Sequence, residues 1–313
     1  MKKVLVLGAS GGMGYSIVKE LAQRGMEVNA FARNKDKLHQ LFQKEDKVTV
    51  ISGDVLELDR LQEAAVGVDT IFHAMNLPYP EWEEKLPLVI NNIVETAKQA
   101  NAKLVIVDNI YAYGKNPGHK VSEATPKIPH TKKGKIRLQL ETMVKQSNIP
   151  VLLAHFPDFY GPNANNTILN YTFENIVKNK RSMFVGDKNI PREYIFTPDG
   201  AKALVELAFI DSAYGENWNI PGSGVITGDE IIAILREHTG FTKKVGTITK
   251  GMVKFLGLFD KGMREVVEML YLTEDPVVLD GEKLEQAIQT IPRTPYKEGI
   301  KQTIDYMLHE KSK

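Results

Sequence analysis

The sequence contains no cysteine among its 313 residues. Disulfide bonds, thiolate nucleophiles and cysteine-ligated zinc sites are therefore excluded, and nothing points to an oxidising compartment. A strong charge of either sign is also missing, since the formal net charge is +1. The chain as a whole therefore carries no field that favours nucleic acid or an anionic membrane, although local charged patches stay open.

Long apolar runs are absent too. No stretch reaches the length of a transmembrane helix, and the N-terminal apolar run is too short and too soon broken by glycine for a signal peptide. The seven histidines show no metal-site spacing such as His-x-x-x-His. We therefore expect a cytoplasmic protein that binds a small-molecule substrate but no metal, nucleic acid or membrane. A homodimer is left open.

What is present begins with a glycine-rich turn. Residues 4–7 predict a buried parallel strand, because the short apolar run ends at glycine. Gly8, Gly11 and Gly14 follow at intervals of three. They suit a tight turn, a close approach of the backbone to a pyrophosphate, and close packing of the next helix. The helix N-terminus would offer N–H groups to the phosphates.

Three glycines alone are a weak pattern, and a glycine turn without a ligand is the alternative. The context favours a dinucleotide, because the turn follows a predicted strand and opens an amphipathic helix over residues 15–24. The predicted phosphate contacts are Gly8, Ser10, Gly11, Gly12, Met13 and Gly14.

The end of the second predicted strand, residues 28–32, indicates which dinucleotide binds. An acidic residue there would bind the adenosine ribose hydroxyls and select NAD, whereas this chain has Arg33 after Ala32. Arg33 can pair with a 2′-phosphate, so NADP is the predicted cofactor and NAD stays open. The alternative is a solvated arginine at a strand end.

Strands and helices then alternate through residue 110. Apolar runs at 48–51, 70–74 and 104–107 predict further strands, and amphipathic segments between them predict helices. This alternation predicts right-handed βαβ units and an α/β fold with a doubly wound parallel sheet. Asn76 follows the fourth strand, where such sheets bind ligands, and we expect it beside the cofactor with Ala74 and Met75.

This βαβ arrangement with Gly-x-x-Gly-x-x-Gly resembles the short-chain dehydrogenase/reductase superfamily. The similarity is strongest to its extended and atypical branches, which include NAD-dependent epimerase/dehydratases, isoflavone-reductase-like proteins and NmrA-like proteins. It implies a Rossmann domain over residues 1–162, rejoined by residues 190–212, and a smaller, mostly substrate-binding lobe over 163–313. The Tyr-Gly-Pro at 160–162 matches the extended members.

The resemblance also implies further cofactor contacts. Asp54 and Val55 correspond to adenine contacts at the end of the third strand, although a turn-forming aspartate is an alternative. Phe156 and Pro157, in the segment before the Tyr-Gly-Pro, correspond to the nicotinamide side.

The catalytic pattern of the superfamily is altered. Asn109 occupies the slot of the catalytic serine or threonine, and Tyr111 remains a candidate proton donor, with a packing tyrosine as the alternative. The Tyr-x-x-x-Lys pair would fall on Lys133 and Arg137 and is missing. Residues 133–137 instead resemble the Lys-x-x-Ile-Arg helix of isoflavone-reductase-like proteins, in which the lysine serves cofactor and substrate.

Lys133 is therefore the predicted general acid/base or ribose ligand, and a cleft with a neighbouring cation would suit it to proton transfer. Lys133, Arg137 and Glu141 recur every fourth residue and share one helix face. The alternative is a solvated basic patch over residues 132–137.

These features favour an NADP-preferring oxidoreductase that transfers hydride to a carbonyl or activated double bond of a small organic molecule. A nucleotide-sensing regulator without turnover, as among NmrA-like proteins, is the alternative from another class. A sugar-nucleotide epimerase or dehydratase is disfavoured, because that chemistry depends on the missing tyrosine. The apolar residues 252–259 and 263–272 predict helical core packing or the wall of an apolar pocket.

Overall fold

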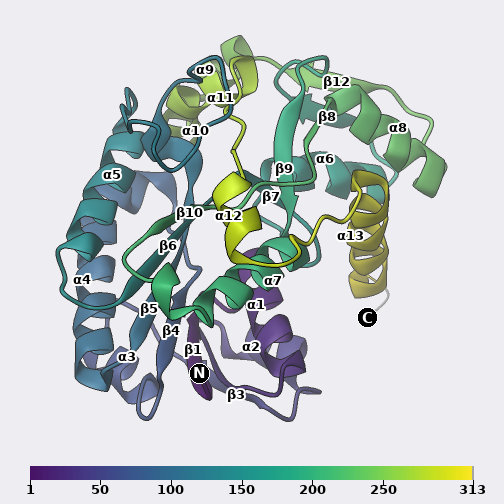
Figure 1. Cartoon of the computed structure of the whole chain (residues 1–313). Helices are drawn as coiled ribbons and strands as arrows, with labels where there is room; N and C mark the ends of the chain where they lie inside the picture. Colours follow the sequence, from purple (N-terminus) through teal and green to yellow (C-terminus); the bar gives the residue numbers. More distant parts are fainter. Residues whose placement is uncertain (312–313) are drawn as a thin grey trace.

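The computed structural model describes residues 1–311. Its centre is a parallel seven-stranded sheet with the order β3-β2-β1-β4-β5-β6-β10 (Figure 1). The strands are β1 (Lys3–Leu7), β2 (Glu27–Ala32), β3 (Val48–Ser52), β4 (Thr70–His73), β5 (Lys103–Asn109), β6 (Val151–Phe156) and β10 (Asn217–Asn219). The predicted doubly wound parallel sheet is confirmed.

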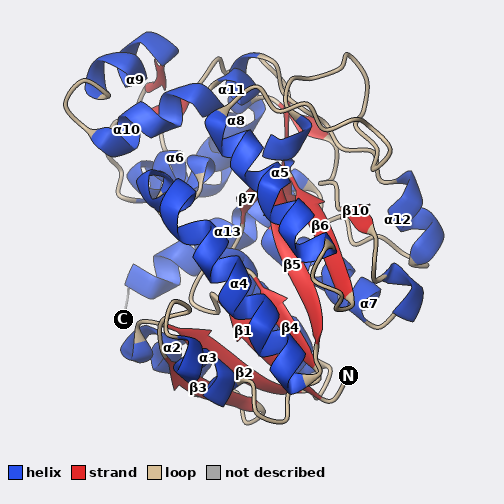
Figure 2. Ribbon diagram, turned by 90° about the vertical axis from the view of Figure 1, so that its left-hand side faces the viewer, coloured by secondary structure: helices blue, strands red, loops and turns tan. Residues whose placement is uncertain are grey.

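Helices cover both faces of this sheet, because neighbouring side chains of a strand point to opposite faces. Val4 and Val6 of β1 face the core formed with α1, α2 and α7, whereas Leu5 and Leu7 face the core formed with α3, α4 and α5. Figure 2 shows α4 and α5 lying across the sheet. The helices are α1 (Gly12–Gln23), α2 (Lys35–Phe42), α3 (Leu58–Ala64), α4 (Trp82–Ala100), α5 (Lys132–Lys145) and α7 (Thr197–Ala208).

The strand β6 is followed by a second strand that the sequence pattern did not reveal. Residues 158–160 form β7 (Asp158–Tyr160), which pairs with β9 (Arg192–Phe196) in a separate sheet completed by β11 (Val225–Ile226). The chain thus leaves the main sheet directly after Phe156. It returns with α7, which packs on α1, and with β10, which pairs with β6.

The remaining elements surround these small sheets. A two-stranded sheet pairs β8 (Ser182–Val185) with β12 (Val245–Ile248), and α6 (Ile168–Val177), α8 (Gly228–Thr239) and α13 (Tyr296–Lys311) enclose a separate apolar core. The helices α9 (Lys250–Leu256), α10 (Lys261–Val266) and α11 (Tyr271–Glu274) lie at the top of Figure 1, and α12 (Glu282–Ala287) lies against β10. We call the part after residue 162 that does not join the main sheet or α7 the second lobe. Among residues 1–311, no helix combines the length and apolar character needed to cross a bilayer.

Candidate functional site

The glycine-rich turn takes its shape from close backbone contacts. Gly8 has a φ of +81°, and a Cβ on it would lie 2.6 Å from the Met75 Cα. A Cβ on Gly14 would lie 2.2 Å from the Gly8 carbonyl oxygen. Larger residues at these two positions would push β1, β4 and α1 apart, which is why both positions require glycine.

Gly11 serves a different purpose, because it leaves the helix end open. It is the N-cap of α1, its φ is −92°, and no side chain caps the helix there. The nearest atom to a Cβ on Gly11 would be the Gly8 carbonyl oxygen at 3.4 Å. The first-turn N–H groups of α1 therefore lack a side-chain cap, and such groups attract an anion.

A cavity of about 470 Å³ lies over this turn, at the carboxyl ends of β1, β2, β3 and β4. Its volume is within the usual range for ligand sites. Of the residues predicted to contact a cofactor, the cavity is lined by Gly8, Ser10, Gly11, Gly12, Met13, Arg33, Asp54, Val55, Ala74, Met75 and Asn76. The uncapped helix end and the glycine backbone fit the diphosphate of a dinucleotide.

Two cations line the end of the cavity next to β2 and β3. Arg33 lies just before α2, and Lys37 lies in the first turn of that helix, four residues further on. Within residues 1–311 neither side chain forms an ion pair. Burial lowers the pKa of Lys37. On the same wall, Asp54 accepts a hydrogen bond from the Leu56 N–H at 3.0 Å, so it also forms the turn considered from the sequence. Lys37 was missed in the sequence, although it follows Arg33 by only four residues.

Residues 161–167 cover the turn from the side of the second lobe. The Asn163 side-chain amide donates to the Ser10 carbonyl at 3.1 Å. A Cβ on Gly12 would lie 2.7 Å from the Ala164 Cα, so the two loops are in tight contact. Residues 163–167 of this loop also line the cavity, and no local signal in the sequence revealed that they reach back over 150 positions.

Lys133 lies outside the walls of this cavity. Its side chain is 1% exposed, and its ammonium contacts two carboxylates: Glu268 at 2.9 Å and Glu265 of α10. A solvated patch is therefore wrong for Lys133, while Lys132 and Lys135 on the same helix are exposed. The expected cleft position beside another cation does not appear either, because Glu265 of α10 and Glu268 just after that helix bring carboxylates to the Lys133 ammonium.

Arg137 is buried one turn along the same face and connects to the cavity. Its guanidinium lies 3.3 Å from an Asp108 carboxylate oxygen and donates to the Asn76 side-chain oxygen at 2.9 Å. It also stacks 4.1 Å from the centre of the Trp82 ring. Asn76 therefore has a cavity-lining position fixed by Arg137, which the sequence did not predict.

His73 lies near this arginine at the end of β4. Its Nδ1 has no hydrogen-bond partner. Burial, together with the Arg137 charge, lowers the pKa of His73 to about 3. The histidine is therefore neutral at physiological pH and part of the core.

The two other predicted catalytic residues are engaged within the fold. The Tyr111 hydroxyl lies 2.8 Å from the Tyr79 hydroxyl, and burial raises the pKa of Tyr111 well above its usual value. The Asn109 side-chain oxygen accepts a hydrogen bond from the Tyr111 N–H at 3.0 Å and thereby caps the short helix that follows β5. Neither side chain lines the cavity. The Lys133 ammonium lies 5.5 Å from the Tyr79 ring centre, so the buried Lys133 and the half-buried Tyr79 and Tyr111 form one group.

Glu141, the third residue of the predicted helix face, belongs to another buried network. It accepts hydrogen bonds from Lys127, Lys145 and Asn217. Burial acts to raise its pKa, but Lys127 and these hydrogen bonds outweigh burial and lower it to about 2. The Nε2 of His155 lies 2.7 Å from the Lys127 ammonium. Lys133, Arg137 and Glu141 thus lie on one face of α5 as predicted, but each of the three charged side chains contacts a different set of partners.

Three further predicted cofactor contacts lie outside the cavity walls. Phe156 belongs to the core shared with α1 and α7, and Pro157 directly follows it as the chain leaves the sheet. Gly14 lies at the packing contact between α1 and β1. Phe159 of β7, which was not predicted, lines the cavity in this region instead.

Comparison with known proteins gives one family match. Residues 8–166 match the model of a family described as NAD(P)H-binding. The glycine-rich turn, Arg33 and residues 161–166 of the covering loop all lie within that range.

Two curated relatives illustrate the sequence similarity. The photosystem II assembly factor Ycf39 of Synechocystis sp. is 22% identical over 267 residues, which cover 83% of this chain and 74% of that protein. The mouse sterol-4-alpha-carboxylate 3-dehydrogenase (decarboxylating) is 31% identical over 111 residues, which cover 34% of this chain and 29% of that enzyme.

Solved structures extend the similarity to the whole fold. The dTDP-glucose 4,6-dehydratase of Bacillus anthracis, in complex with NAD, superposes with a TM-score of 0.80 at 18% identity and covers 100% of this chain and 98% of its own. The UDP-glucuronic acid 4-epimerase of Bacillus cereus, also in complex with NAD, gives a TM-score of 0.79 at 18% identity, with 99% and 100% covered. At these identities the similarity establishes the fold alone.

Proposed function

Because this chain belongs to the NAD(P)H-binding family, we propose that it is an NADP-preferring oxidoreductase. It transfers hydride to a carbonyl or an activated double bond of a small organic molecule. The observation that carries the cofactor preference is the pair Arg33 and Lys37, which line the cavity next to β2 without a carboxylate partner among the described residues. Two adjacent cations suit the doubly charged 2′-phosphate that distinguishes NADP from NAD.

Replacing both cations tests this preference. In Arg33→Ala/Lys37→Ala we expect the affinity for NADPH to fall about 100-fold, because each charge-assisted hydrogen bond contributes about 1.5 kcal/mol or more. The affinity for NADH should change less than about threefold, since NADH lacks the 2′-phosphate. Titration calorimetry with both dinucleotides measures the two constants.

A matched control is Lys35→Ala/Lys44→Ala, which removes two exposed lysines from the same region without touching the cavity wall. Its affinities should equal those of the wild type. Equal affinities of the wild-type protein for NADPH and NADH would defeat the NADP proposal and leave a general dinucleotide site.

For the chemical step, we propose that Lys133 and Tyr111, with Tyr79, handle the proton that must accompany hydride transfer. The dinucleotide supplies the hydride when bound. The three side chains are held together at the carboxyl end of β5, a position at which parallel sheets collect catalytic groups. Access of a substrate to Lys133 requires that α10 and the residues after it shift, because Glu265 and Glu268 contact the lysine.

Tyr111→Phe tests this assignment with little change of shape. We expect kcat to fall about 100-fold or more, the range of a lost general acid, while NADPH affinity stays within about twofold. Tyr113→Phe is the control, because Tyr113 lies on the same short helix but bonds Asn219 instead. Unchanged turnover in Tyr111→Phe and in Lys133→Ala would remove both residues from the mechanism.

A second function is favoured by one observation: Lys133 is buried against Glu265 and Glu268, and neither Lys133 nor Tyr111 lines the cavity. A regulator that senses the NADP/NADPH ratio needs the cofactor site but no access to Lys133. NADPH oxidation across a panel of aldehydes, ketones and enones separates the two, since a sensor binds the dinucleotide without turnover. Activity on a nucleotide sugar would instead favour the epimerase or dehydratase chemistry of the structural neighbours.

A further inference from the structure

The helices α9 and α10 and the turn between them expose a group of apolar side chains, which we call the apolar tip. Phe255, Leu258 and Phe259 are 63%, 67% and 80% exposed, and Met252, Leu256 and Met263 are exposed beside them. The two phenylalanine rings pack on each other with centres 5.6 Å apart. The sequence predicted that these side chains would be buried in a helical core or a pocket wall, and that prediction is wrong. Val253 alone of this run is turned into the core.

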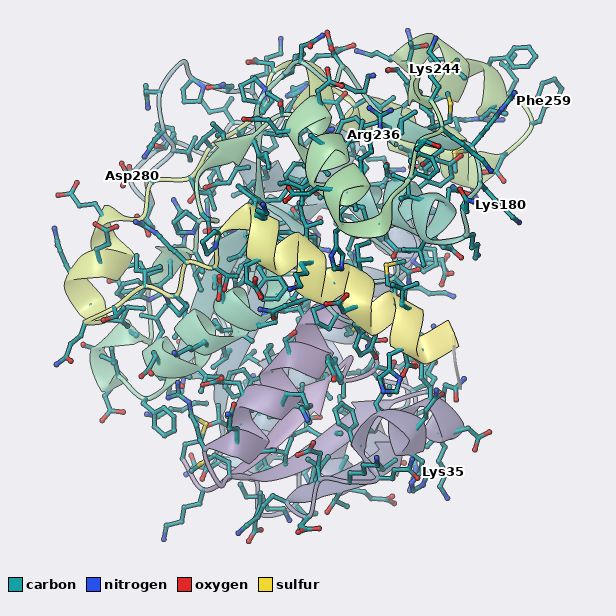
Figure 3. All side chains as sticks on the ribbon, turned by 90° about the vertical axis from the view of Figure 1, so that its right-hand side faces the viewer. Lys35, Lys180, Arg236, Lys244, Phe259 and Asp280 are labelled. Carbon is teal, nitrogen blue, oxygen red and sulfur yellow. The ribbon has the colours of Figure 1, made fainter. Side chains whose placement is uncertain are left out.

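The surroundings of this tip are basic. Residues 240–264 contain five lysines and one arginine against a single acidic residue, Asp260. Lys244, Lys254 and Lys261 are exposed, and none of them forms an ion pair with another residue in the described part of the chain. Lys180 and Arg181 next to β8 add two more exposed cations. Figure 3 shows Lys180, Lys244 and Phe259 toward the same end of the second lobe, far from Lys35.

A second copy of this chain is a poor occupant for the tip. In a two-fold dimer the same patch meets itself, so the lysines around one tip would face those around the other. The hairpin from residue 249 to 264 is also small, since a standard interface takes about 20–30 residues from each partner. Apolar side chains surrounded by lysines, of which Lys244, Lys254 and Lys261 have no ion-pair partner among residues 1–311, instead complement a surface that is apolar within and negative outside.

We propose that this hairpin, residues 249–264 with Lys244 and Lys180, docks the protein on anionic lipid bilayers. Phe255, Leu258 and Phe259 enter the boundary between headgroups and acyl chains, and the lysines contact the lipid phosphates. Such peripheral binding needs no membrane-spanning helix. It also explains why a chain with almost no net charge carries a concentrated basic region here, and it is independent of the proposed reaction.

Vesicle flotation tests the proposal with the full-length protein. We expect the wild type to bind vesicles of phosphatidylcholine mixed with phosphatidylserine and not vesicles of phosphatidylcholine alone, and to be released by high salt. Phe255→Ser/Phe259→Ser should weaken binding about tenfold or more, since it removes the two largest inserting side chains. Lys244→Glu/Lys254→Glu should weaken binding by a similar factor at low salt.

Matched controls change the same kinds of residues elsewhere. Val66→Ser/Leu88→Ser alters exposed apolar side chains near the main sheet, and Lys44→Glu alters an exposed lysine after α2, so neither should affect binding. NADPH affinity should be the same in all these variants, which shows that they fold. Absence of wild-type binding at low salt, or equal binding by the wild type and the phenylalanine variant, would overturn the proposal. The proposal would also be overturned if the wild type did not bind vesicles but formed a concentration-dependent dimer that Phe255→Ser/Phe259→Ser abolished.

Discussion

Gly11→Asp is expected to abolish dinucleotide binding while leaving the fold intact. The new carboxylate would sit at the N-cap of α1, where it can accept the first-turn N–H groups that a diphosphate would otherwise use. Two unit charges about 4 Å apart near a protein surface repel by roughly 4 kcal/mol. Allowing for screening, we expect the affinity for NADPH to fall at least about 100-fold.

Stability and charge can be separated in this experiment. Gly11 has an ordinary φ and space for a Cβ, and aspartate is a better N-cap than glycine by a few tenths of a kcal/mol, so the melting temperature should hold or rise slightly. Gly11→Asn provides the matched neutral cap and should bind NADPH at least about tenfold more tightly than the aspartate variant. Wild-type affinity in Gly11→Asp, measured by calorimetry, would place the diphosphate elsewhere.

The second large effect concerns acid stability. His73 has a pKa of about 3 in the folded protein, because burial and the Arg137 charge oppose its protonation, whereas an unfolded histidine has a pKa of about 6.5. The unfolded chain therefore binds more protons between these values. From this residue alone, the free energy of unfolding of the protein should fall by about 1.4 kcal/mol for each pH unit below about 6.5.

His73→Leu removes this titrating side chain and its contribution to the pH dependence of stability. Between pH 7 and pH 4 the variant should lose about 3 kcal/mol less stability than the wild type in urea titrations. At neutral pH it should be at least as stable, because the unpartnered Nδ1 is removed. The comparison between variants matters because other buried groups titrate too. Burial raises the pKa of Glu193 to about 7, which favours the folded state as pH falls, and His155 acts in the same direction as His73.

The control is His39→Leu at an exposed position of α2, which should follow the wild-type pH dependence. Parallel curves for the wild type and His73→Leu would mean that the histidine is not held neutral. Glu141, whose folded pKa is about 2, contributes its stability above about pH 4.5 and loses it in the more acidic range below that. Its effect therefore overlaps the histidine range only below about pH 4.5, and it is common to the wild type and His73→Leu.

Several features could be read from the sequence because they are local. The strand before Gly8, the spacing of the glycines and the position of Arg33 each depend on a few neighbouring residues. The capping box of Thr227 with Glu230 at the start of α8, and the left-handed Gly240 at its end, are local features of the same kind. The resemblance to short-chain dehydrogenases/reductases, based on such signals, is confirmed by the family match and the fold.

The partners of the charged residues could not be read in this way. Lys133 was correctly placed on a helix face with Arg137 and Glu141, but the carboxylates that contact it, Glu265 of α10 and Glu268 just after that helix, lie more than 130 positions later in the chain. The apolar run at 252–259 had the composition of a core segment and became an exposed tip. Composition cannot distinguish these outcomes, because burial depends on whether another element arrives to cover the side chains.

The sequence by itself determined the βαβ start, the open helix end at Gly11 and the parallel sheet, because periodicity and glycine conformation act over a few residues. The tertiary structure alone decided that residues 161–167 cover the glycine turn, that α10 seals Lys133, and that Phe255 and Phe259 face outward. These outcomes depend on how the second lobe packs against the sheet. That packing sums many weak contacts between residues far apart in the chain, and no short stretch of sequence encodes it.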